Sequence, residues 1–282
     1  MRDESMQSSR EKWFPLGIVL LALIFLYFPF LVKLIEDWGT NDDYSHGYFI
    51  PFLTLYFIYC MRDELKKIAI KPCNPGLLVI LAGLGQLIVG KIGSEFFLQR
   101  TSLLVVLFGI ALFLLGWQYF KMLFLPLAYL IFMIPLPAII WNKIAFPMQL
   151  FSSYLTEQVV STLGIPIYRE GNVMHLAQTT LEVVAACSGL RSLVTMFALS
   201  GALALLSTLT AKKKIILFFS AAPIAIFANT VRLTATALMA TEIGAAAAQG
   251  FLHEFSGIVV FVLGMGLLIA VNWLLGKFTF HR

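Results

Sequence analysis

The chain has 282 residues, of which 60% are hydrophobic and only 12% are charged, a composition far from that of a soluble domain. It excludes a water-solvated globular fold and predicts a polytopic membrane protein. The formal net charge is +5, but most of the Lys and Arg residues lie in short links between apolar runs, where they are interpreted as topology signals. A nucleic-acid partner is therefore not expected.

Apolar runs of membrane-spanning length follow one another along most of the chain. A hydrocarbon core of about 30 Å needs about 20 apolar residues, and shorter or tilted spans are tolerated. The first run follows a basic N-terminus, is too long for the apolar region of a signal peptide and has no cleavage site, so it is interpreted as a retained helix. The sequence predicts eight spans, over residues 14–33, 47–61, 76–91, 101–119, 122–136, 188–210, 214–240 and 254–276. The expected fold is an all-α membrane protein in a single domain, residues 1–282.

The basic residues predict the orientation of these spans. With a cytoplasmic N-terminus, alternation of the loops places thirteen of the twenty Lys and Arg residues inside. Five fall outside and two lie within spans, so the positive-inside rule favours this orientation over its mirror image. Both termini are then cytoplasmic, and the end of the sixth span that holds Cys187 faces the periplasm.

Residues 137–187 form the longest stretch that does not span the membrane. Apolar residues recur at helical spacing over 138–163, which predicts an amphipathic helix at the outer interface. After Gly164 and Pro166 the pattern changes, and residues 167–184 predict two or three short strands with a turn at 170–172. We expect this small β element to cap a site from outside.

Cys187 stands where the strand-like stretch meets the sixth span. Cys60 and Cys73 lie at the cytoplasmic side in the predicted topology, so Cys187 has no disulfide partner within the chain. A buried cysteine in a helical bundle is often only a small apolar residue. A helix N-terminus, however, stabilises a thiolate, and Arg191 lies one turn further on the same face. Ser188 and Gly189 leave room for a substrate backbone, and the first-turn amides are candidates for an oxyanion hole.

Polar residues at two other helix positions are predicted to share the depth of Cys187. Asn229 and Arg232 lie three residues apart in the seventh span, and Arg232 is about 27 Å from the start of that span. Ionisable groups inside spans are costly and indicate function, although Arg232 could also snorkel to the interface and Asn229 could bond a neighbouring helix. The pattern leaves the lateral distances between these residues open.

Two histidines compete for the role of acid–base catalyst. His253, followed by Glu254, opens the eighth span at the outer interface, and His46 opens the second span at the same depth. Spacing alone does not choose between them. No metal site is expected, because His253 has no second histidine four residues away and no cysteine pair has zinc-ligand spacing.

Four segments together resemble the exosortases, membrane enzymes of bacteria. Residues 186–192, with Cys187, are similar to the cysteine motif of that family; residues 223–232, with Asn229 and Arg232, to its arginine motif; and His253 with Gly257 to its histidine motif. Residues 43–51 are similar to its N-terminal signature. The order and spacing agree, and the resemblance covers nearly the whole chain.

The resemblance implies a cysteine-dependent peptidase or transpeptidase of the bacterial inner membrane. It implies Cys187 as nucleophile, Arg232 as stabiliser of the oxyanion or substrate, and His253 as general acid and base, in preference to His46. It further implies exported protein substrates that end in a Pro-Glu-Pro motif, an apolar helix and a basic cluster, and no cofactor. The alternative is a transporter or a protein that handles lipid-linked glycans.

Overall fold

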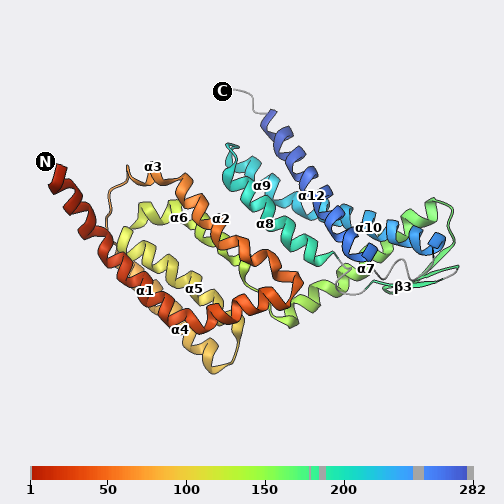
Figure 1. The fold of residues 1–282 in the computed structure, drawn as a ribbon, viewed down its shortest axis with the longest axis horizontal. Coiled ribbons are helices and arrows are strands. Elements are labelled where there is room, and N and C mark those ends of the chain that lie inside the picture. Colours follow the sequence, from red (N-terminus) through yellow and green to blue (C-terminus); the bar gives the residue numbers. More distant parts are fainter. Residues whose placement is uncertain (1, 178, 184–188, 244–250, 278–282) are drawn as a thin grey trace. The chain divides into compact units, whose positions relative to one another are not determined.

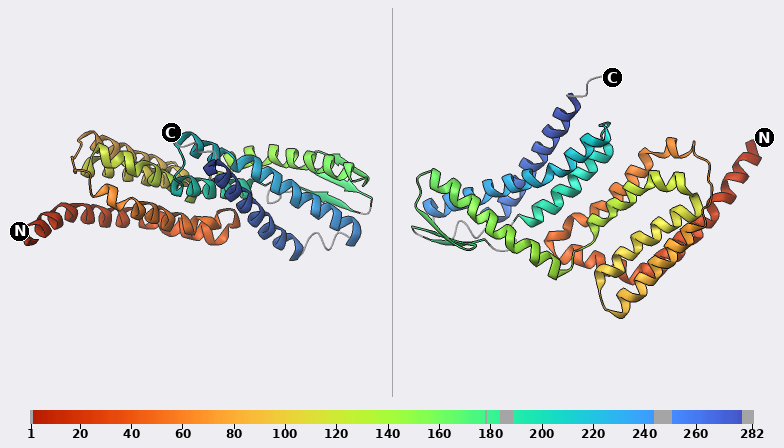
Figure 2. Two further views of the ribbon diagram at one scale, coloured as in Figure 1. Left: turned by 90° about the horizontal axis from the view of Figure 1, so that it is seen from above. Right: turned by 180° about the vertical axis from the view of Figure 1, so that it is seen from behind.

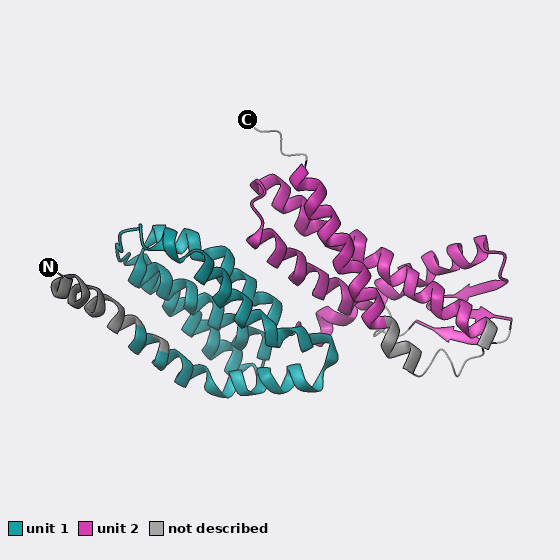
Figure 3. Cartoon of the chain, turned by 45° about the horizontal axis from the view of Figure 1, so that its top comes forward, with its two compact units in different colours: residues 1–135 teal, residues 136–282 magenta. Residues whose placement is uncertain are grey.

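The computed structural model describes the chain except for residues 1, 178, 184–188, 244–250 and 278–282, and only the backbone of residues 2–16, 20, 242–243 and 251–256. The chain forms two compact units, Met1–Pro135 and Leu136–Arg282 (Figure 3). Apart from one short three-stranded sheet, the described elements are helices, as expected for the predicted fold class.

The first unit is helical throughout its described elements. Figure 1 shows α4 and α5 side by side, and the small residues of α4 explain how closely they pack. Gly76, Gly83 and Gly90 recur every seven residues, and a Cβ atom on Gly83 would come within 2.7 Å of the Val106 side chain of α5. The elements are α1 (Arg2–Thr40), η1 (Asp42–Tyr48), α2 (Phe49–Cys60), α3 (Arg62–Leu65), α4 (Pro75–Ile92), α5 (Phe96–Ile110), η2 (Ala111–Leu115), α6 (Trp117–Tyr129) and η3 (Leu130–Met133).

The helix that contains the fourth predicted span breaks at Gly116. This residue has φ of 89°, which favours glycine, and the backbone carbonyl of Lys71 occupies the space of a Cβ atom. The preceding π-turn, η2, leaves carbonyls that accept hydrogen bonds from the Lys71 and Cys73 amides. The predicted boundaries of 101–119 and 122–136 are therefore wrong by several residues, because the break precedes Trp117.

The first helix continues beyond its predicted end at residue 33. Asp37, on the added turns of α1, pairs with Arg100 of α5, and the Trp38 indole donates a hydrogen bond of 2.8 Å to the Met133 carbonyl. Arg100 directly precedes the predicted fourth span, but it is buried, with 5% exposure, inside a helix. The ion pair explains this placement, since a buried guanidinium needs a partner.

The second unit begins with α7 (Ala138–Thr162), which confirms the predicted helix over 138–163. Three strands follow in an antiparallel sheet of order β1-β2-β3, and Gly171, with φ of 64°, forms the predicted turn between the first two. The remaining elements among the described residues are four helices. In order, the bounds are β1 (Ile167–Glu170), β2 (Val173–Leu176), β3 (Thr180–Glu182), α8 (Leu190–Leu206), α9 (Ala211–Phe219), α10 (Ala221–Ile243) and α12 (Phe251–Lys277).

Two apolar clusters join the elements of this unit. The sheet packs against α7 and the second half of α10, where Val160, Leu176 and Ala237 are buried together. Near the start of α10, Met196 of α8, Ile224 of α10 and Leu268 of α12 form another cluster. Figure 2 shows the strands beside α7 and α10, and α8 beside α12. α10 is thus the helix that contacts both the sheet and the other long helices.

Five helices of the described residues are long and apolar enough to cross a membrane, or six if α6 and α7 count together as one broken span. These candidates are 17–40, 75–92, 96–115, 211–241 and 257–277. The predicted number of eight is not confirmed, because α2 has 12 residues, α6 has 13 and α8 has 17. The five candidates still establish a multi-pass membrane protein.

Candidate functional site

α10 carries two buried polar side chains of the predicted site. Asn229 is 1% exposed and Arg232 is 9% exposed, although the surrounding helix is apolar. Residues three apart on a helix share a face, so the amide and the guanidinium occupy one side of α10. A buried amide and a buried cation are costly unless they interact with other groups, which makes this face a candidate for chemistry.

The cysteine motif contacts this face through Gly189. Gly189 is the N-cap of α8 and has φ of 84°, and a Cβ atom at this position would lie 2.8 Å from Cγ of Asn229. The close approach therefore depends on the absence of a side chain. It confirms that the start of α8 and the Asn229–Arg232 segment of α10 lie side by side.

A third helix completes the contact around Asn229. The Nδ2 atom of Asn229 donates a hydrogen bond of 3.2 Å to Oγ of Ser152 on α7, and Ser152 is 3% exposed. Thr156, one turn further on α7, is fully buried and donates to the Ser152 carbonyl. Ser152 is not among the residues predicted from the sequence. The available signal was its spacing of four residues from Thr156, which marks one polar stripe on α7.

The sheet anchors the chain on the other side of Arg232. Val183, directly after β3, is buried against Met174 of β2 and Leu233 of α10, next to Arg232. The chain thus touches α10 at Leu233 before residues 184–188 and at Asn229 after them. Both contacts are on the same stretch of one helix, about 6 Å apart along its axis.

Several predicted site residues belong to this unit but are described only in part. Cys187 and Ser188 lie outside the described residues. Arg191 is half-buried in the first turn of α8. His253 and Glu254 lie in the first turn of α12, where only the backbone is described.

The packing of α8 against α12 shows at which end of these helices His253 lies. Gly264 of α12 lies against Met196 of α8, where a Cβ atom would come within 2.5 Å of the Met196 methyl group. Leu190 precedes Met196 by six residues, and the residue six positions before Gly264 on α12 is residue 258. His253 precedes that position by five residues, or about 7 Å of helix. Its backbone is therefore at the same end of the helices as Gly189.

The competing histidine belongs to the other unit. His46 is half-buried in η1, and its Nε2 atom donates a hydrogen bond of 3.1 Å to the Phe132 carbonyl. Burial lowers the pKa of His46 below its ordinary value of 6.5 and outweighs the bond to Phe132, which acts in the opposite direction. This environment favours a neutral imidazole, whose hydrogen bond joins η1 to η3.

The fold and the convergence of α7, α8 and α10 define a class of protein: a multi-pass membrane protein with a buried polar site at one end of its helices. The comparison with known families narrows this class. A family model described as transmembrane exosortase matches residues 38–270, most of the chain, and the chain belongs to this family of membrane sorting enzymes. No curated protein and no solved structure matches the chain.

Proposed function

We propose that the protein is a cysteine peptidase or transpeptidase that cleaves the C-terminal sorting signal of exported proteins. The observation that carries this proposal is the contact of Gly189 with Asn229. Cys187 is two residues before Gly189, and two residues of chain span at most about 7 Å. This short separation along the chain supports a role for the Cys187 thiol near the helix face that carries the buried Arg232.

The three candidate groups have complementary chemistry. His253 takes the proton of the Cys187 thiol, and the sulfur attacks the carbonyl carbon of the scissile peptide bond. The guanidinium of Arg232 stabilises the negative oxygen of the tetrahedral intermediate, an effect of about 3 kcal/mol for one donor. The carbon–nitrogen bond then breaks, and the leaving amine takes the proton from His253.

The second half of the reaction restores the enzyme. An acceptor hydroxyl or amine, or water, attacks the thioester carbonyl and gives its proton to His253. The carbon–sulfur bond breaks, and the thiolate recovers a proton from the imidazolium. Asn229 and Ser152 are positioning residues in this scheme, since they hold the start of α8 against α10 rather than touch the reacting atoms.

The expected substrates are exported proteins with a Pro-Glu-Pro motif, one apolar helix and a basic cluster at the C-terminus. Such a helix would lie beside the enzyme in the bilayer and bring the scissile bond to the end of α8, so that much of the entropy of association is lost before the chemical step. The active site would face the periplasm of the inner membrane. A role for Arg191, Glu254 or His46 stays a prediction.

Replacement of Cys187 tests the proposal. In cells that co-express a substrate with the three-part tail, C187A should abolish conversion to the shorter product on an immunoblot, and C187S should reduce it strongly. Cys60 and Cys73 are the other two cysteines of the chain, and C60A and C73A should process at the wild-type rate. Processing by C187A at the normal rate would refute the assignment and favour the transporter alternative.

A further inference from the structure

A polar pocket opens at the end of α8 that is opposite to Gly189. α8 has 17 residues, so the two ends are about 25 Å apart. The pocket has a volume of about 540 Å³, within the range of small-molecule sites, and lies between the α8–α9 loop and the last turns of α12. Its lining includes Leu206, Ser207, Thr208, Asn272, Trp273 and Lys277.

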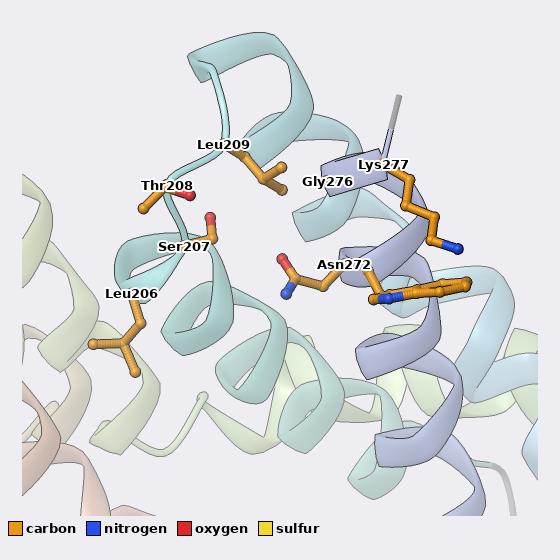
Figure 4. Close-up of a pocket in the computed structure, with 8 residues that line it drawn as sticks. Leu206, Ser207, Thr208, Leu209, Asn272, Gly276 and Lys277 are labelled. Carbon is orange, nitrogen blue, oxygen red and sulfur yellow. The ribbon is translucent and has the colours of Figure 1, made fainter. Parts of the chain in front are cut away.

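The polar groups of the pocket come from both of its walls. Figure 4 shows the Asn272 side chain extending from α12 toward Ser207 at the end of α8. The Oδ1 atom of Asn272 is buried and has no hydrogen-bond partner among the described residues. At the rim, the Lys277 ammonium lies 3.7 Å from the centre of the Trp273 ring. The pocket therefore offers a buried acceptor, two hydroxyls and a cation.

The charge around the pocket has one sign. Lys212, Lys213 and Lys214 open α9 next to the α8–α9 loop, and the Nζ atom of Lys213 donates 2.7 Å to the Leu275 carbonyl, which ties α9 to α12. The sequence has no Asp or Glu between residues 190 and 241 or between 257 and 282. Lys277 lines the pocket, and three further lysines stand at the N-terminus of α9, where the dipole disfavours cations. The two acid-free segments supply no counter-charge to these lysines.

We propose that this pocket binds the headgroup of an anionic glycerophospholipid of the phosphatidylglycerol class. The phosphodiester accepts hydrogen bonds from Lys277 and the Thr208 hydroxyl, and a glycerol hydroxyl donates to Oδ1 of Asn272. Trp273 and Lys277 lie at the C-terminal end of α12, and such residues are typical of the depth of lipid headgroups. Lysine clusters attract anionic lipids. This site does not depend on the proposed peptidase activity.

Lipid retention by the full-length protein tests this site. The purified protein, washed in detergent, is incubated with equal amounts of phosphatidylglycerol, phosphatidylethanolamine and phosphatidylcholine, and bound lipids are counted by native mass spectrometry. We expect phosphatidylglycerol to be retained about fivefold or more above either zwitterionic lipid, and N272A and K277Q each to remove most of that preference. Millimolar inorganic phosphate should not displace the lipid.

A second Lys–Trp pair provides a matched control. Lys121 lies 5.4 Å from the centre of the Trp117 ring, with the same spacing of four residues, but outside the pocket. K121Q should retain phosphatidylglycerol like the wild type. Equal retention of the three lipids, an equal loss in K121Q and K277Q, or displacement by inorganic phosphate would overturn the assignment. Lys277 is exposed, so K277Q keeps the test valid even if N272A does not fold.

Discussion

At the scale of single residues, Gly189 combines a left-handed backbone with a close contact to Asn229. An alanine there is strained by about 1 kcal/mol or more and also collides with the Asn229 amide. We predict that G189A lowers the rate of substrate processing about tenfold or more. Gly266 of α12 has nothing within 4 Å of its Cβ position, so G266A should process normally. Equal rates for the two variants would show that the contact has no functional role.

His46 predicts a dependence of stability on pH. Its pKa is lower in the folded protein than the ordinary value of 6.5, so the unfolded chain binds the proton more tightly. The stabilisation is fully present above about pH 6.5 and is lost as the pH falls through the lowered pKa. The melting temperature in detergent should therefore fall on acidification. That of H46Q should fall less steeply because glutamine does not titrate, while its amide keeps a donor for the Phe132 carbonyl.

A matched variant identifies the histidine that is responsible. His175 lies in β2 of the other unit, 3.9 Å from Glu170. The melting temperature of H175Q should keep the part of its pH dependence that comes from His46. A melting temperature of H46Q that fell as steeply with pH as that of the wild type would contradict the assignment to His46.

At the scale of elements, the Ser152–Asn229 hydrogen bond joins α7 to α10. Loss of a single buried hydrogen bond costs about 1 kcal/mol, so S152A should lower kcat for processing several-fold with little change in KM. The exposed Ser161, near the end of α7, provides the control S161A. In a double-mutant cycle, S152A should add little to N229A, because both remove the same contact. Strict additivity would indicate that the residues act separately.

The elements that the sequence predicts well are those with local signals. The turn at Gly171 and the helix over 138–163 were predicted because glycine and helical periodicity act within a few residues. The break at Gly116 was missed, because an apolar run contains no sign that the Lys71 carbonyl packs there. Ser152 was missed because its partner Asn229 is 77 residues away, although its spacing from Thr156 indicated a polar stripe on α7.

At the scale of the whole molecule, the alternation of loops between the two sides of the membrane predicts that Cys60 is cytoplasmic. The side chain of Cys60 is exposed in the structure. In a C73A/C187A background, a membrane-impermeant maleimide should label Cys60 in inside-out vesicles but not in intact cells. Lys91, exposed at the end of α4, is predicted on the other face, so K91C in a chain without the three cysteines should show the reverse pattern. Labelling of Cys60 in intact cells would contradict the predicted topology and favour the inverted one.

The sequence selects candidate site residues, but it does not predict how they are arranged in space. Motif resemblance selected Cys187, Arg232 and His253, and helix lengths gave them a common depth. The lateral contact between the cysteine and arginine motifs was not predictable, because it depends on a glycine without a side chain fitting against Asn229. The family match over residues 38–270 confirms the resemblance to the exosortases.

The most direct measurement is the isolation of the covalent intermediate. The enzyme is mixed with its tailed substrate, quenched in acid and digested, and the Cys187 peptide is weighed by mass spectrometry. We predict an acyl adduct on Cys187 that hydroxylamine releases, as expected for a thioester, and that H253A enriches if it slows the second step. Substrate cleavage with no adduct on Cys187, or with an adduct on another residue, would contradict the account.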